Sequence, residues 1–401
     1  MNNICLASNW DQKLVEEAAK LNSEFEGSGG RIYELFATLR TSVVGGGRPS
    51  AMIPDVAKEQ AGDYIELVHA SGMRFNYLLN SACMGNREYH PKHHAELISY
   101  LDEIVNLGAD SVTIAIPYLM EVVRDQYPDL EIISSSFCRI DSVRKAVFFE
   151  ELGAKRIVLP HTIRRKFGLI KRIRDAVDCD IELLVNNTCI HQCALANYHA
   201  GNSSHASQLE TVKYGGHYIQ YSMFHCNIQR LRDPAELLKS TWVRPEDVVR
   251  YEKLGIDFVK IEGRNRTTDW ILNAARAYLE RQYDGNAFDL LSQTVLGYLQ
   301  QNPLIDEPLP ALDINIDNRA LEGFLDFFES GNCKDDCTRC SYCGDFAKKA
   351  VRFDKNLAAR YIDSANALIK HLKTSSFIKD FEETGLEWEE KAPKDATMKA
   401  K

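Results

Sequence analysis

The chain has 401 residues, of which 45% are hydrophobic and 26% are charged, a composition typical of a soluble globular protein. No apolar run approaches the ~20 residues that cross a bilayer. The first residues also lack the basic and apolar segments of a secretory signal, so we expect a cytoplasmic protein without a membrane span. The formal net charge of −9 argues against a broad electrostatic grip on nucleic acid and therefore against a nucleic-acid partner.

Residues 1–30 predict a helical lead-in that ends in Gly27-Ser28-Gly29-Gly30. From residue 31 to 285, β-rich apolar runs alternate with helical patterns, several of which end in a glycine that suits a left-handed cap. Alternation of this kind indicates βα units, and eight units predict an α/β fold with a closed (β/α)8 TIM-like barrel. An open doubly wound sheet is the competing architecture. The runs typical of strands are 32–39, 74–80, 111–116, 131–136, 156–160, 181–186, 218–226 and 257–263.

The regular alternation stops after residue 285. Residues 286–385 contain helical patterns, a Pro-bearing stretch and a group of cysteines, and they predict a cysteine-rich, mainly helical C-terminal appendage. Residues 386–401 are charged and poor in apolar side chains, which predicts a disordered tail.

The strongest single pattern is a quartet of cysteines with the spacing C-x3-C-x2-C-x2-C. One short loop brings its four thiolates to one site at little entropic cost, which predicts a structural zinc or a [4Fe–4S] cluster. The first three cysteines have the spacing of the adenosylmethionine-radical motif, but that motif normally follows the first strand of a barrel. A quartet without metal is the other alternative. The four residues are Cys333, Cys337, Cys340 and Cys343.

A second set of cysteines follows the strand-like runs of the barrel. Cys189 and Cys193 come directly after the run 181–186, and Cys226 ends the run 218–226. Because the reactive groups of barrel enzymes lie at the carboxyl ends of the strands, we expect the three thiolates to converge there on one iron–sulfur cluster. Three unrelated buried thiols are the alternative. The fourth ligand stays open between Cys83, Cys138, a quartet cysteine, His191, His225 and an iron that binds substrate.

Polar side chains follow the other predicted strands. Arg48, after three glycines, suits a carboxylate or phosphate, and Glu262 and Arg264 suit either a substrate clamp or a rim ion pair. His161 can act as an acid or base near neutral pH or hydrogen-bond within the rim. The catalytic candidates are therefore His161, Glu262 and Arg264, and the substrate-binding candidates are Arg48, Asn187 and Tyr118.

Three segments resemble the collagenase-like peptidase family, peptidase family U32. They begin with GADSVTIAIPYL at Gly108, IELLVNNTCIHQC at Ile181 and DFVKIEGRNRTTDW at Asp257, and together they cover about residues 108–285. KIEGR, at Lys260–Arg264, is the family's most recognisable string. The resemblance implies a TIM-like barrel and a [4Fe–4S] cluster held by four cysteines before KIEGR. For several members it implies oxygen-independent hydroxylation of ubiquinone precursors or of RNA bases.

The match to the family's cysteines is incomplete. Cys189 looks like the first cluster ligand, Cys193 like a shifted second, and Cys226 stands alone where a later pair belongs. Asn186-Asn187 replaces a His-Gly, and His161-Thr162 replaces an Arg-Glu. The resemblance therefore implies a divergent branch with its own cysteine-rich tail.

These observations predict an iron–sulfur oxidoreductase or hydroxylase that modifies a small-molecule or peptide-like substrate. One alternative is an atypical U32-type peptidase, although no Ser-His-Asp or HExxH arrangement is visible. The other is a non-catalytic iron–sulfur subunit that works with a partner protein in a biosynthetic or RNA-modifying complex. The substrate, the electron or oxygen donor and the oligomeric state stay open.

Overall fold

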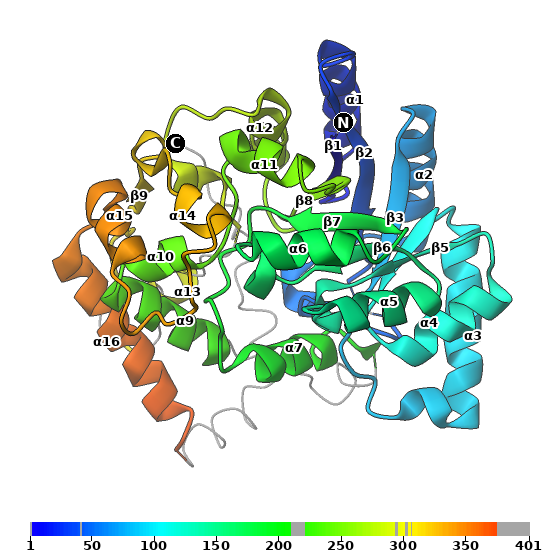
Figure 1. Ribbon diagram of the computed structural model, residues 1–401. Helices are drawn as coiled ribbons and strands as arrows, with labels where there is room; N and C mark the ends of the chain where they lie inside the picture. Colours follow the sequence, from blue (N-terminus) through cyan, green and yellow to red (C-terminus); the bar gives the residue numbers. More distant parts are fainter. Residues whose placement is uncertain are drawn as a thin grey trace. The chain divides into compact units, whose positions relative to one another are not determined.

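The computed structural model describes residues 2–40, 42–209, 221–292, 296–300, 304–305 and 307–374 (Figure 1). The chain divides into two compact units. The barrel unit takes Met1–Asn186, Ala196–Tyr218 and Val243–Tyr283. The second unit takes Asn187–Leu195, Ile219–Trp242 and Asp284–Lys401. Among the described residues, no helix is long and apolar enough to cross a membrane.

The barrel unit contains a closed barrel of parallel strands, which confirms the predicted (β/α)8 fold. Each strand pairs with its neighbour in the sequence, and the first strand pairs with both the second and the eighth, so the sheet has no free edge. The strands are β1 Asn2–Ala7, β2 Gly30–Ala37, β3 Arg74–Leu79, β4 Ser111–Ile114, β5 Glu131–Ser134, β6 Ala154–Leu159, β7 Asp180–Leu184 and β8 Phe258–Ile261.

Helices follow most strands of this unit, as their sequence signals predict. The Asp11 side chain accepts the Lys13 N–H at the start of the first helix, and Thr267 accepts the Trp270 N–H at the start of the last. Gly108 and Gly153 end two helices with φ of 91° and 106° and return the chain to the next strand. The helices are α1 Gln12–Glu24, α2 Lys58–Ala70, α3 Pro91–Asn106, α4 Pro117–Gln126, α5 Val143–Glu151, α6 Phe167–Arg174, α7 Ala196–His205, α11 Val248–Glu252 and α12 Thr268–Glu280.

Two of the predicted elements are wrong. The lead-in, residues 1–30, is not helical throughout, because Asn2–Ala7 is the barrel strand β1 and only Gln12–Glu24 is a helix. The expected strand 218–226 is helical from Tyr221 onward, and its first three residues lie outside the described part of the chain. Its apolar side chains Phe224, Ile228 and Leu231 repeat at helical spacing and are buried, so the helix buries one apolar stripe.

The second unit is mainly helical, as expected of the appendage, but it includes two segments from between β7 and β8. The long helix α16 packs along α9, and α15 packs against α10. Two short strands, β9 and β10, pair in an antiparallel sense. The expected tail, residues 386–401, lies outside the described residues. The elements are α9 Tyr221–Arg232, α10 Ala235–Lys239, α13 Leu296–Gln300, α14 Asp326–Glu329, α15 Tyr342–Ala350, α16 Lys355–His371, β9 Asn315–Ile316 and β10 Val351–Arg352.

A layer of charged side chains fills the middle of the barrel. Arg156 on β6 bonds Glu34 on β2 at 2.7 Å and Glu182 on β7 at 2.9 Å, and Lys260 on β8 lies 3.0 Å from the other oxygen of Glu182. Glu34 and Glu182 are fully buried and Arg156 is 3% exposed. Two cations therefore neutralise two carboxylates in a region without water, and the four charges tie together four strands.

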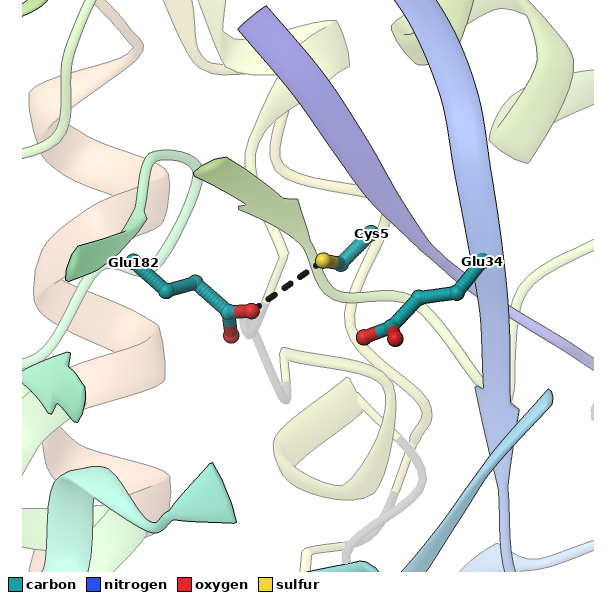
Figure 2. Close-up of side chains that lie close together, drawn as sticks. All are labelled: Cys5, Glu34 and Glu182. Carbon is teal, nitrogen blue, oxygen red and sulfur yellow. Dashed lines mark hydrogen bonds between the residues drawn. The ribbon is translucent and has the colours of Figure 1, made fainter. Parts of the chain in front are cut away.

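Cys5 lies within the same layer. Figure 2 shows the carboxylates of Glu34 and Glu182 pointing toward the region of the Cys5 thiol, which donates to Glu182 at 3.1 Å. Burial and the two carboxylates raise the pKa of Cys5 well above its usual value. These three residues are close enough to share an ion, but the thiol is held protonated and both carboxylates already have cationic partners. We interpret the layer as structural rather than as a metal site.

Removing one cation from this layer tests its structural role. We expect Arg156→Met to lower the free energy of unfolding by about 3–5 kcal/mol, because it leaves two buried carboxylates without their shared partner. Denaturant unfolding measures the change. The matched control is Arg276→Met, which breaks the exposed pair with Glu24 and should cost less than ~1 kcal/mol. Equal losses in the two variants would contradict the structural interpretation.

The layer also predicts acid sensitivity. Burial alone would raise the pKa of Glu182, but Lys260 and Arg156 lower it to about 2. Since its folded pKa lies below the unfolded value of ~4.3, the carboxylate stabilises the fold fully above that pH. The stabilisation is lost as the pH falls toward 2. Denaturation midpoints measured across this window should fall more steeply in the wild type than in Glu182→Gln, and parallel profiles would refute the assignment.

Candidate functional site

The glycine loop after β2 is bound to the barrel unit through its own amides. The N–H groups of Gly45, Gly46 and Gly47 donate to the side-chain oxygens of Ser42, Ser207 and Asn80 at 2.7–2.8 Å. A Cβ on Gly47 would lie 3.0 Å from the Asn80 side chain, so the close approach requires glycine. These amides already donate to side chains of the protein.

The residue after the three glycines, Arg48, contributes a guanidinium group to the site. Its Nη2 lies 3.7 Å from the Glu262 carboxylate, and the two side chains are only 11% and 15% exposed. Asn186, which follows β7, fixes the backbone of Glu262 from both sides. Its side-chain nitrogen donates to the Glu262 carbonyl and its oxygen accepts the Glu262 N–H, each at 2.9 Å. Two of the predicted rim residues, Arg48 and Glu262, thus do meet.

Two further arginines follow β8, and Arg48 and Glu262 influence the pKa of each. Arg264 is 5% exposed, and burial together with Arg48 lowers its pKa to about 9, with Glu262 opposing the shift. Burial and Arg48 also lower the pKa of Arg266, again against Glu262. Within the described part of the chain, Nη1 of Arg264 has no hydrogen-bond partner. We call Arg48, Arg264 and Arg266 the mouth arginines.

Local packing after β8 determines how these arginines are presented. The Arg266 guanidinium lies over the Trp270 ring, 5.1 Å from its centroid, and the Arg266 N–H donates to the Gly263 carbonyl at 2.7 Å. A Cβ on Gly263 would come within 2.6 Å of the same ring. The turn between Glu262 and Arg266 therefore depends on glycine and on Trp270. Arg266, two residues after KIEGR, follows the same predicted strand but was not among the predicted catalytic or substrate-binding residues.

Three other candidates lie in different surroundings. His161 begins a short helical turn directly after β6, at the strand end where it was predicted. Tyr118 lies on α4, where its hydroxyl contacts His94 at 3.3 Å and its ring packs on Tyr89. Asn187 belongs to the second unit, where its side chain accepts the Cys189 N–H at 2.9 Å. The roles predicted for Tyr118 and Asn187 in substrate binding therefore stay predictions.

The three cysteines after β7 belong to the second unit rather than to barrel strands. Cys226 is buried on α9, and the predicted strand end is wrong. Its thiol hydrogen-bonds with Cys193, and this bond, together with burial, raises the pKa of Cys226. The nearby Cys189 raises the same pKa further. Arg230, one turn along α9, lowers the same pKa and donates to the Thr188 carbonyl. Cys226 is therefore influenced by Cys193, by Cys189 and by a buried cation of the same unit.

The quartet precedes and enters helix α15 of the same unit. Cys343 lies in the first turn of this helix. Burial raises the pKa of Cys337, and the nearby Cys333 raises it further. Asp335, between the first two cysteines, contacts His191 at 3.3 Å, so the quartet loop and the Cys189–Cys193 segment lie against each other within this unit. Cys83 and Cys138, the other ligand candidates, belong to the barrel unit, where Cys138 lies 3.6 Å from the Ile114 carbonyl.

Comparisons with known proteins give a consistent family. A model described as peptidase family U32 matches residues 51–287. An uncharacterized protease of Methanocaldococcus jannaschii is 28% identical over 339 residues, which are 84% of this chain and 93% of that protein. A solved U32 peptidase is 20% identical with a TM-score of 0.45, covering 66% of this chain and 94% of that one. An IMP dehydrogenase/GMP reductase-like protein from Corynebacterium glutamicum is 14% identical with a TM-score of 0.28, covering 52% and 62%.

The turn after β8 can be tested without removing any charge. We expect Gly263→Ala to destabilise the protein by about 1–3 kcal/mol, because the new methyl group overlaps the Trp270 ring and must displace it. Denaturant unfolding measures the loss. The double variant Gly263→Ala with Trp270→Leu should recover part of it, since the shorter side chain makes room. An unchanged stability in Gly263→Ala would contradict the tight packing described here.

Proposed function

The chain belongs to peptidase family U32, and from this we propose that it is an iron–sulfur enzyme that modifies a small-molecule or peptide-like substrate by redox chemistry, such as oxygen-independent hydroxylation. The observation that carries the proposal is the gathering of Cys189, Cys193 and Cys226 in one unit, with a hydrogen bond between the last two thiols. Soft thiolates brought together in this way select iron–sulfur clusters or zinc.

The surroundings of the three thiols fit such a centre. Arg230 is buried beside Cys226 and favours its ionised form, which is the form that ligates metal. The Asn187 side chain accepts a hydrogen bond from the Cys189 N–H, and the Arg230 guanidinium donates one to the Thr188 carbonyl. Both polar groups of the Thr188–Cys189 peptide are therefore hydrogen-bonded before any metal binds.

When bound, a [4Fe–4S] cluster supplies or accepts single electrons. The other tasks are assigned to this chain's own side chains. Arg48 and Arg264 bind and orient the substrate, and Asn186 positions the Glu262 backbone beside them. His161, at the end of β6, gives or takes a proton through its imidazole.

The quartet is proposed as a second, independent metal site. Its four sulfurs come from one short loop and the first turn of α15, which is the arrangement of structural zinc sites and of cysteine-bound clusters. Either metal would join this loop to the first turn of α15.

A peptidase is the second candidate, because the family and the relative from Methanocaldococcus jannaschii both carry peptidase or protease descriptions. The two candidate functions differ in whether the reaction requires a metal cluster. Hydrolysis of a peptide needs no electron transfer, so it would persist in protein whose cysteine sites have been emptied. A non-catalytic subunit would instead co-purify with a partner and turn over no substrate.

The cysteine sites can be assigned by metal analysis. After anaerobic purification we expect the wild type to contain iron and sulfide with visible cluster absorbance. The iron and sulfide contents should fall at least tenfold in Cys189→Ala and in Cys226→Ala. Cys337→Ala should keep that absorbance and lose only the metal of the quartet. The matched control is Cys179→Ala, a half-buried thiol of the barrel unit that should retain every metal.

Three results would decide against the proposal. Wild-type protein that is colourless and iron-free when purified without air would refute the cluster. So would iron that survives in Cys189→Ala and Cys226→Ala alike. Peptide cleavage that is equal in the wild type and in Cys189→Ala would favour the peptidase instead.

A further inference from the structure

We propose that the mouth arginines Arg48, Arg264 and Arg266 bind a doubly charged oxygen group of the substrate, either a phosphate monoester or a pair of neighbouring carboxylates. The inference rests on the proposed function in one respect, that the barrel mouth is where substrate binds. It goes further by naming the chemistry that the substrate must carry there.

The first argument is the number of charges. Three guanidinium groups influence one another at the mouth, and Glu262 is the carboxylate that acts on Arg264 and Arg266 among the described residues. Buried charges are normally paired, because removing an ion from water is costly. Among the described residues, one carboxylate against three guanidinium groups leaves two positive charges, which a dianion neutralises and a monoanion does not.

The second argument is an unused donor. Arg264 is 5% exposed, and its Nη1 has no hydrogen-bond partner in the part of the chain that the structure describes. A guanidinium is a planar fork that binds carboxylate and phosphate oxygens through two parallel hydrogen bonds. Arg264 therefore keeps a buried donor for which the described part of the chain provides no acceptor.

The third argument is topology. Strand β1 pairs with β2 on one side and with β8 on the other, so the loops that follow β2 and β8 flank the same strand at one end of the barrel. Arg48 comes from the first loop and Arg264 and Arg266 from the second. Barrels frequently bind phosphate at loops after their last strands, at the carboxyl end. Arg264 and Arg266 occupy that position, and Arg48 comes from the loop on the other side of β1.

The amides of the glycine loop are not expected to hydrogen-bond the dianion. All three already donate to Ser42, Ser207 and Asn80. The group is therefore held by side-chain guanidinium forks rather than by a backbone cradle. Substitution of the arginines should consequently remove the affinity, and no residual backbone site should remain.

Binding of small probes tests the charge requirement. Titration calorimetry and thermal unfolding would compare inorganic phosphate, succinate and acetate at constant ionic strength. We expect phosphate, succinate or both to bind at least tenfold more tightly than acetate and to raise the unfolding temperature. A preference for phosphate identifies a phosphate monoester, and a preference for succinate identifies a dicarboxylate. Equal, weak binding of all three would overturn the inference.

The variant Arg264→Gln gives two readouts with opposite signs. Without added anion its unfolding temperature should equal or exceed that of the wild type, because a buried unpaired charge is gone. With phosphate or succinate the rise in temperature should disappear and the Kd should increase at least tenfold. Arg48→Gln is the second variant and should also weaken binding at least tenfold. Retained affinity in both variants would overturn the inference.

Two controls separate this inference from the proposed function. Arg276→Gln removes an exposed arginine of α12 that pairs with Glu24, and it should bind the dianion as the wild type does. Cys189→Ala should lose iron and still bind the dianion. Loss of iron-dependent chemistry with intact dianion binding would refute only the proposed function. Intact iron with no dianion binding would refute only the inference made here.

Discussion

The constraint on which the barrel depends is the neutralisation of charge at its centre. Arg156 joins Glu34 to Glu182, and Lys260 completes the set, so strands far apart in the sequence must align within hydrogen-bond distance. A slip of one residue in any of these strands would turn its charge outward and leave the partners buried alone. The same alignment determines where the strands end. Asn186 and Glu262 lie beyond the charged residues of β7 and β8 and exchange two hydrogen bonds.

Most of the barrel could be predicted from the sequence because parallel buried strands are continuous apolar runs between amphipathic helices. The errors arose where that signal is ambiguous. Asn2–Ala7 contains only a short apolar run and no preceding helix, so its strand character comes from pairing on both sides, which is a long-range property. Tyr221–Arg232 begins with alternating polar and apolar residues, and its helical repeat emerges only when Ile228 and Leu231 are included.

The candidate site was predicted less completely, for a related reason. KIEGR pointed to Glu262 and Arg264, and the glycine run pointed to Arg48, and the structure brings these side chains together. The expected cluster at Cys189, Cys193 and Cys226 stays a prediction, and Cys226 lies on a helix instead of at a strand end. The charged layer around Cys5 was missed altogether, because each of its members is a single polar residue in an apolar strand and has meaning only beside its partners.

The contrast between the two charged regions of the barrel unit bears on function. In the central layer Arg156 and Lys260 meet two carboxylates, and the charges cancel, as expected of groups that serve the fold. At the mouth the arginines outnumber the acidic partner that acts on them among the described residues, and Arg48 and Arg264 each keep a nitrogen without a hydrogen-bond partner there. A protein that gained only stability from these side chains would be better served by fewer of them. The excess charge is therefore consistent with a ligand that completes the site, while the central layer keeps the strands that present it in register.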